Sequence, residues 1–195
     1  FTYKDYLTWP DDERWELIRG VAYNMSPVPN RRHQGLLAEL SADFTLFFRG
    51  HPCSAYFAPF DVLFPEDSRA EDADDTADTV VQPDLVVICD SAKLTEQGCT
   101  GAPDFVLEIL SPSTAFKDME DKLQLYESRG VREYWILNPG NDTLLVYSVV
   151  PDGAAGANPG AAGFCKPVLF TREDTVAPRI FPDLTINLAR VFARE

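Results

Sequence analysis

Two short, nearly uninterrupted apolar runs constrain the fold of this chain more than any other feature of its sequence. Residues 84–89 read DLVVIC, and residues 104–110 read DFVLEIL. Runs of this length without polar alternation are typical of strands that are covered on both faces. The second run carries a carboxylate, Glu108, at a position where an uncompensated charge is costly. The sequence therefore predicts a buried sheet that holds a charged group.

The rest of the chain alternates between further predicted helices and strands. The predicted helices are residues 1–7 (with Thr2 as N-cap), 32–48, 114–129 and 188–192, and the further strands are 21–25, 55–64 (bent at Pro59), 131–137 and 143–149. Residues 66–78 are predicted to form an acidic surface loop, and residues 151–163 a flexible Gly/Ala-rich loop. We expect one α/β (α+β) domain over residues 1–195, a mixed β-sheet core flanked by helices, with N-terminal and C-terminal strands added.

The four cysteines are expected to be reduced. Cys53, Cys89, Cys99 and Cys165 contain no CxxC pair and no metal-type spacing. Reduced structural cysteines are typical of a cytoplasmic protein, which is the predicted location. No apolar run approaches the roughly 20 residues that a membrane-spanning helix needs, so no membrane association is expected.

The formal net charge of −14 constrains the class of partner. Residues 66–78 hold seven acids and one arginine, and the remainder of the chain still carries −8. Nucleic-acid binding usually depends on a basic surface, because neutralising phosphates supplies much of the affinity. The charge argues against general DNA binding unless basic residues gather on one rim, the candidates being Arg14, Arg19, Arg31, Arg32 and Lys117.

The dipeptide Pro-Asp occurs twice, and only one copy is placed to act with Glu108. Asp104 precedes Glu108 by four residues on the same predicted strand, which separates them by roughly 13 Å. Asp84 begins a different strand, and adjacent strands lie only about 4.8 Å apart. Two carboxylates that meet in a partly buried place favour a divalent cation. The alternative is that Asp84 caps backbone amides while a buried lysine or arginine neutralises Glu108.

A cation for Glu108 can come from the helix predicted over residues 114–129. Its apolar face is expected to pack on the sheet and to consist of Phe116, Met119, Leu123 and Tyr126. Lys122 lies at the edge of this face and can extend toward Glu108, whereas Lys117 is expected to point into solvent. An exposed, solubilising role for Lys122 stays open on spacing alone.

These residues carry a resemblance to a known superfamily. Pro83-Asp84 followed by Glu108 resembles the PD-(D/E)xK motif of restriction-endonuclease-like nucleases, although Ile109-Leu110 stands where x and Lys would be. The longer pattern PDLVVI…PDFVLEILSPST…DK…Y…GV…EYWILNP resembles the Uma2-type bacterial branch, in which the lysine is displaced onto the following helix. The segment of residues 15–33, which begins with WELIRG, is similar to the same branch. The strand around Asp61 is similar to it as well.

The resemblance implies a restriction-endonuclease-like fold and a metal-dependent endonuclease that acts on DNA, expected as a homodimer. The resemblance implies that Asp84, Glu108 and the Ile109 carbonyl bind Mg²⁺ or Mn²⁺. It implies that Lys122 orients or deprotonates the attacking water, and that Glu16 is an additional acid supplied by the first helix. His33 and Asp61 are implied to be supporting residues. Glu16 as a surface acid and His33 as an ordinary helix-start residue remain alternatives.

Two other functions compete with the endonuclease. One is an inactive nuclease-fold protein that serves as a nucleic-acid-binding or protein-interaction module. The other is an interaction protein whose acids are structural, which the net charge favours. The combination of Asp84, Glu108 and Lys122 favours the enzyme over an inactive scaffold.

Overall fold

The two apolar runs form the centre of a six-stranded mixed sheet. The computed structural model describes residues 1–10, 13–25, 29–66, 73–111, 115–149 and 163–193. Its larger sheet has the order β11-β10-β9-β8-β6-β3. The strands are β3 (Ser54–Phe57), β6 (Leu85–Ile88), β8 (Phe105–Ile109), β9 (Glu133–Asn138), β10 (Thr143–Ser148) and β11 (Val168–Thr171). Every residue of β6 and β8 is buried, which confirms the expectation of strands covered on both faces.

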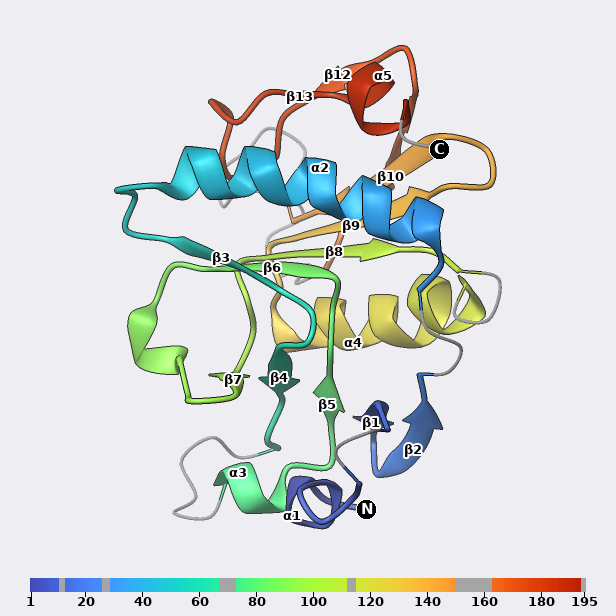
Figure 1. Ribbon diagram of the computed structural model, residues 1–195. Helices are drawn as coiled ribbons and strands as arrows, with labels where there is room; N and C mark the ends of the chain where they lie inside the picture. The colour runs from blue at the N-terminus through green and yellow to red at the C-terminus, as the bar shows by residue number, and fades with distance from the viewer. Residues whose placement is uncertain (11–12, 26–28, 67–72, 112–114, 150–162, 194–195) are drawn as a thin grey trace.

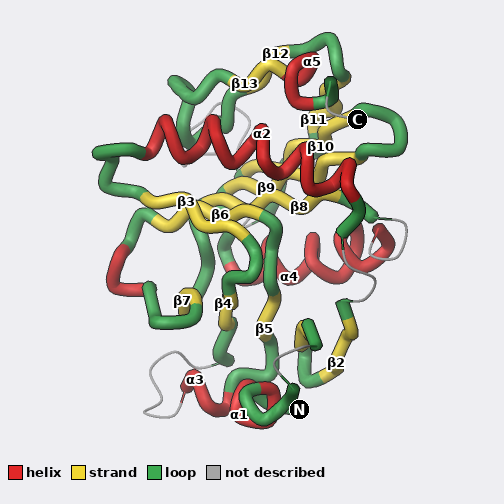
Figure 2. The backbone as a smooth tube through the Cα atoms, viewed as in Figure 1, coloured by secondary structure: helices red, strands yellow, loops and turns green. Residues whose placement is uncertain are grey.

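Helices cover both faces of this sheet (Figures 1 and 2). Helix α2 (Arg31–Phe48), which was expected over residues 32–48, packs on one face through Leu36, Leu40, Phe44 and Phe48. Helix α4 (Lys122–Arg129) packs on the other face through Leu125 and Tyr126. It ends at Gly130, whose φ of 86° is the left-handed conformation that glycine adopts without strain.

A second, smaller sheet lies beside the larger one. It has the order β2-β1-β5-β4-β7. Its strands are β1 (Trp15–Ile18), β2 (Val21–Asn24), β4 (Asp61–Leu63), β5 (Val80–Val81) and β7 (Gly98–Thr100). The chain changes sheet several times; two of these crossings are from β3 to β4 and from β5 to β6, and the latter runs through Gln82, Pro83 and Asp84. The crossing places Asp84 at the junction of the two sheets.

The crossing from β3 to β4 corrects the prediction of one bent strand over residues 55–64. The chain instead forms two strands, β3 and β4, which belong to different sheets and are separated by a cis Ala58–Pro59 peptide bond. Proline was expected to bend the strand, but it marks the point at which the chain leaves one sheet for the other.

The remaining elements are short. They are α1 (Tyr3–Tyr6), α3 (Ala73–Thr76), η1 (Ser91–Lys93), β12 (Thr175–Val176), β13 (Ile186–Asn187) and α5 (Leu188–Val191). Thr2 caps α1 as predicted. Within the predicted acidic loop, residues 67–72 lie outside the described part of the chain, but α3 follows them and Ala77 is buried. Residues 151–162 of the predicted Gly/Ala-rich loop also lie outside the described residues.

The helix predicted over residues 114–129 differs from expectation in its helical phase. Residues Lys117–Asp121, labelled η2, form a π-helical turn before α4 begins. A π-turn inserts one extra residue and rotates the following side chains relative to the preceding ones. The predicted apolar face is therefore wrong at its start: Phe116 is 74% and Met119 44% exposed, while Asp118 and Lys122 are buried.

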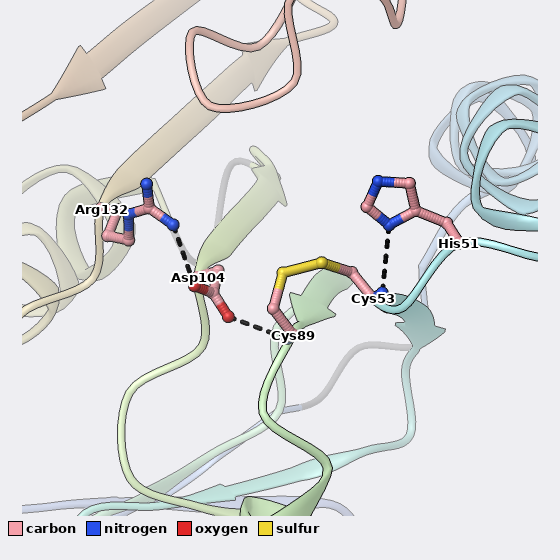
Figure 3. The surroundings of a disulfide bond; sticks show 5 residues. All are labelled: His51, Cys53, Cys89, Asp104 and Arg132. Atoms are coloured by element: carbon pink, nitrogen blue, oxygen red, sulfur yellow. Dashed lines mark hydrogen bonds and ion pairs between the residues drawn. A yellow bond between two sulfur atoms is a disulfide. The ribbon is translucent and has the colours of Figure 1, made fainter.

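Cys53 and Cys89 form a disulfide, so the expectation of four reduced cysteines is wrong. Ser54 pairs with Ile88 in the β3–β6 ladder, which makes Cys53 and Cys89 the next opposed residues. Figure 3 shows the bond beside Asp104, which accepts a hydrogen bond from the Cys89 amide at 2.9 Å. The pairing depends on strand register across 36 residues, which cysteine spacing does not reveal. Cys99 and Cys165 are free.

Among the described residues, no helix has the length and apolar character needed to cross a membrane.

The disulfide predicts a specific thiol count and a loss of stability on reduction. Unfolding without reductant should expose two reactive thiols, from Cys99 and Cys165, and reduction should raise the count to four. Closing a loop of this length restricts the unfolded chain, so Cys53→Ser should lower the free energy of unfolding by about 2–4 kcal/mol. Thiol titration and urea unfolding of the oxidised protein check both values.

Cys165→Ser is the matched control for this experiment, because it removes a free thiol of intermediate exposure. It should lower the thiol count by one and leave stability unchanged within about 0.5 kcal/mol. Four reactive thiols in the unreduced, unfolded protein would contradict the disulfide.

Candidate functional site

Glu108 on β8 is compensated by the lysine that its sequence context predicts. Successive residues of a strand face opposite sides of the sheet. Leu107 and Ile109 pack on the α2 side, so Glu108 faces α4. Lys122 Nζ donates a hydrogen bond to Glu108 Oε1 at 2.7 Å, and the Tyr126 hydroxyl donates to the same oxygen at 3.1 Å. Both donors come from α4.

Glu16 brings the small sheet to the same lysine. It lies on strand β1, not on the first helix as expected, and it is completely buried. Lys122 Nζ lies 2.8 Å from Glu16 Oε1, and the amide of Gln82 donates to the same oxygen at 2.9 Å. These contacts overturn the alternative that Glu16 is a surface acid.

Lys117 also binds Glu16, which contradicts its predicted exposure to solvent. Its Nζ donates to Glu16 Oε2 at 2.5 Å, and the side chain is only 11% exposed. Lys117 begins the π-turn, and a uniform α-helix does not account for its position. The sequence showed the lysine but not the phase of the helix that carries it.

Asp118 adds a third carboxylate that the sequence analysis missed. Its Oδ1 lies 3.5 Å from Lys122 Nζ, one π-helical turn away, and the residue is only 2% exposed. The Tyr134 hydroxyl donates to the Asp118 carbonyl at 2.9 Å and holds the turn against β9. Lys122 therefore lies among carboxylates from β1, β8 and the π-turn. We call Glu16, Glu108, Asp118 and Lys122 the lysine cluster.

Burial and charge act in opposite directions on the two glutamates. Burial is the largest cause that raises the pKa of Glu108 to about 8; Lys122 lowers this pKa, whereas Asp118, Asp84 and Glu16 raise it. Burial also acts to raise the pKa of Glu16, but Lys122 and Lys117 together lower it to about 2. Burial alone would lower the pKa of Lys122, but Glu108, Glu16 and Asp118 raise it well above 10.5. Without metal, Lys122 is thus a permanent cation and Glu108 holds a proton near neutral pH.

Asp84 lies beside the cluster rather than inside it. Its Oδ2 accepts a hydrogen bond from the Ile109 amide at 2.8 Å and lies 3.1 Å from His33 Nε2. The neighbour of Glu108 in sequence, Ile109, is therefore held against Asp84 across the β6–β8 pair. Asp104, the acid of the second Pro-Asp, is instead held at the disulfide by the Cys89 amide and by Arg132 at 3.2 Å (Figure 3).

The donor set of Asp84 and Glu108 fits a hard divalent cation. Their hydrogen bonds within the described residues involve Asp84 Oδ2 and Glu108 Oε1, which leaves the second oxygen of each carboxylate available. Mg²⁺ prefers such oxygens and keeps several waters, so a small protein ligand set suffices. Within the described ranges no group of three acidic, histidine or cysteine side chains is arranged as a complete metal cage.

Asp61 supports the site through Gln82, a residue that the sequence analysis missed. Gln82 Nε2 donates to Asp61 Oδ1 at 2.8 Å, and Tyr3 and Tyr6 donate to the Asp61 carboxylate at 3.4 and 3.3 Å. Arg14 donates to Gln82 Oε1 at 2.9 Å. Because the Gln82 amide binds Glu16, this network fixes the acid from the small sheet. The only sequence signal for Gln82 was its place directly before Pro83-Asp84.

Comparisons with known proteins agree with this fold. The model of a family described as "Uma2: Putative restriction endonuclease" matches residues 3–189. The chain is similar to the crystal structure of a putative nuclease belonging to DUF820 from Anabaena variabilis, with a TM-score of 0.73 and 19% identity over 99% of this chain and 98% of that chain. At this identity the likeness shows the fold, and it confirms the predicted mixed α/β architecture. No curated protein matches the chain.

The raised pKa of Glu108 predicts how metal-free stability depends on pH. Between about pH 5 and about pH 8 the folded protein keeps a proton on Glu108 that the unfolded chain has released, so stability falls as the pH rises. In the Glu108→Gln variant the side chain at position 108 is neutral at every pH, so this proton release does not occur. Lys122 still has Glu16 and Asp118 as charged partners. In chelator, the variant should therefore gain at least about 1 kcal/mol over the wild type near pH 8. Urea unfolding of the wild type and the variant at about pH 5 and about pH 8 measures this difference in the free energy of unfolding.

Glu16→Gln is the matched control, because the same substitution acts there on an acid whose pKa is lowered. The stability that Glu16 contributes is present above its unfolded pKa and is lost only as the pH falls toward about 2. This variant should be less stable than the wild type at both pH values. A Glu108→Gln protein with the wild-type pH slope would contradict the assignment.

Proposed function

Because the chain belongs to the Uma2 family of putative restriction endonucleases, we propose that it is a metal-dependent endonuclease that hydrolyses DNA phosphodiester bonds. The observation that carries the proposal is the position of Lys122. Its ammonium is buried and bonded to Glu108 on β8, which pairs with β6, the strand that directly follows Asp84. A permanent cation bonded to a carboxylate that could hold a metal suits phosphoryl chemistry, where charge stabilisation dominates.

We assign Asp84, Glu108 and Lys122 to the three functional positions of a PD-(D/E)xK site. The lysine of that motif normally follows the second acid on the same strand, where this chain has Leu110. Lys122 reaches Glu108 from the helix instead, at 2.7 Å. The displacement keeps the ammonium beside the acid and leaves the strand position apolar.

Asp84, Glu108 and the Ile109 carbonyl would hold Mg²⁺ or Mn²⁺. A bound cation of this kind polarises the phosphate and lowers the pKa of a coordinated water. The charge of that cation would also favour ionised Glu108, whose pKa is high in its absence. Binding should therefore release a proton from this residue near neutral pH.

Lys122 acts as a charged donor rather than as a base. Glu16, Glu108 and Asp118 raise its pKa well above the ordinary value, so it does not give up its proton under neutral conditions. A fixed ammonium can orient the attacking water and stabilise the negative charge that develops on the phosphoryl oxygens. Glu16, held by Gln82 and Lys117, positions Lys122 for this role.

The acidic composition bears on how DNA would approach. Of the basic residues expected on one rim, Arg14 and Lys117 are bonded to Gln82 and Glu16 inside the structure. Their charge supports the site rather than an open basic surface. Binding should accordingly be local, at a few phosphate contacts, and the expected homodimer would supply two such sites. Sedimentation of the full chain checks the dimer.

Cleavage of supercoiled plasmid in Mg²⁺ or Mn²⁺ tests the proposal. Asp84→Asn should lower the rate at least about a hundredfold, because it weakens both the metal site and the charge stabilisation that the metal provides. Asp104→Asn is the matched control, since it changes the acid of the other Pro-Asp, which binds Cys89 and Arg132 instead. Equal effects of the two substitutions, or wild-type protein that never cuts, would favour an inactive binding or interaction module.

Lys122→Gln separates metal binding from chemistry. The substitution removes the cation and leaves both oxygens proposed for the metal, so calorimetry should still detect Mn²⁺ while cleavage falls at least about a hundredfold. Lys93→Gln, which loses a hydrogen bond to the Ala102 carbonyl, should cleave like the wild type. A thermal melt checks that each variant is folded. Full activity of Lys122→Gln would refute the assigned role.

A further inference from the structure

A cavity of about 320 Å³ opens at the start of α2 and the ends of β8 and β9, and one of its lining residues, His33, contacts Asp84. Figure 1 shows the beginning of α2 lying over the end of β8. The polar residues that line the cavity are Asn30, Arg32, His33, Ser111 and Asn138. None of its described lining residues is acidic, although the chain carries a net charge of −14. This lining favours an anion.

The start of α2 supplies backbone donors to the cavity. The first amides of a helix have no acceptor within the helix, and its N-terminus carries a partial positive charge. Asn30 Oδ1 accepts from the His33 amide at 2.9 Å, and the Asn30 carbonyl accepts from Gln34 at 3.1 Å. The N-cap therefore leaves the amide of Arg32, a residue that lines the cavity, for an external acceptor. Helix N-termini of this kind bind phosphate.

Two buried nitrogens at this cavity independently point to a missing ligand. In the described part of the chain, Arg32 Nε and His33 Nδ1 are buried and lack a hydrogen-bond partner. His33 is only 6% exposed. Its other ring nitrogen, Nε2, is turned to Asp84. Buried polar atoms in native proteins are nearly always bonded to protein, ordered water or an ion, so these two atoms mark a position where an acceptor can bind.

The charge around Arg32 is positive even after its ion pair is included. Arg32 Nη2 binds Asp142 Oδ1 at 2.5 Å, and Arg172 binds the other oxygen of Asp142 at 3.3 Å. Two guanidinium groups thus share one carboxylate. The pair with Asp142 also fixes the Arg32 guanidinium, so that Nε is pre-oriented for an acceptor.

We infer that this cavity binds a phosphate group of the nucleic-acid backbone, adjacent to the one that is cut. Arg32 Nε and the Arg32 amide donate to its oxygens, and the His33 ring lies between this group and Asp84. The nucleic-acid part of the inference rests on the proposed function, whereas the phosphate part does not. His33 would couple the position of the bound phosphate to Asp84, and this coupling would set the register of the substrate at the metal.

Titration of the metal-free protein with inorganic phosphate tests the cavity without any cleavage. Arg32→Gln should weaken phosphate binding at least about tenfold, because it removes a charge-assisted donor. Arg31→Gln is the matched control: it removes the same charge from the next residue, which is exposed and outside the lining. It should leave the affinity within about twofold.

The two histidines give a second, internal readout. The chain contains only His33 and His51, and His51 lies at the disulfide, with Nδ1 accepting from the Cys53 amide (Figure 3). In ¹H–¹⁵N spectra of the imidazole rings, phosphate should shift the His33 signals and leave those of His51 in place. Absence of binding, equal loss in both arginine variants, or shifts confined to His51 would overturn the inference.

A short DNA duplex in chelator separates this inference from the proposed function. Arg32→Gln should weaken duplex binding more than Arg31→Gln does. If Arg32 matters for phosphate but not for the duplex, the ligand is a small phosphate compound and the nucleic-acid part fails. If phosphate binds through Arg32 but plasmid is never cut, the cavity stands and the endonuclease proposal fails. If plasmid is cut and the two variants behave alike toward phosphate and duplex, the cavity inference fails.

Discussion

The buried ammonium of Lys122 is the contact on which the arrangement of this molecule depends. It joins Glu16 of the small sheet, Glu108 of the large sheet and Asp118 of the π-turn, each at 3.5 Å or less. Each carboxylate alone would be costly to bury, and the lysine alone would be costly as well. Together they hold two sheets and a helix in one geometry, since separating any of them leaves a buried charge without its partner.

The polar residues next to the lysine cluster connect it to the candidate metal ligand. Gln82 connects the buried Asp61 to Glu16 with one side chain and one amide, at the point where the chain passes between the sheets. Directly after it, Pro83-Asp84 opens the central strand β6. One tripeptide therefore links the support of the lysine cluster to the candidate metal ligand.

The parts of the structure that follow from local patterns could be predicted from the sequence. The double-sided strands, α2, the β9–β10 hairpin and the approach of Lys122 to Glu108 follow from apolar runs and spacing. The disulfide, the division of residues 55–64 between two sheets, and the contacts of Lys117 and Asp118 could not be predicted. These depend on strand register and helix phase, which arise from packing between distant segments. Gln82 was missed because an amide carries no charge signal, and its role is visible only from its partners.

The π-turn has a consequence for how related chains are compared. The position of the buried ammonium beside Glu108 depends on two independent properties: a lysine in the helix, and one extra residue in the turn before it. The lysine can be recognised directly in a sequence, whereas the extra residue of the turn is recognised only from the number of residues between the strand and the lysine. A homologue could retain every charged residue and still turn its lysine away from the strand if it lacked that single residue, so insertions and deletions here carry as much functional information as substitutions.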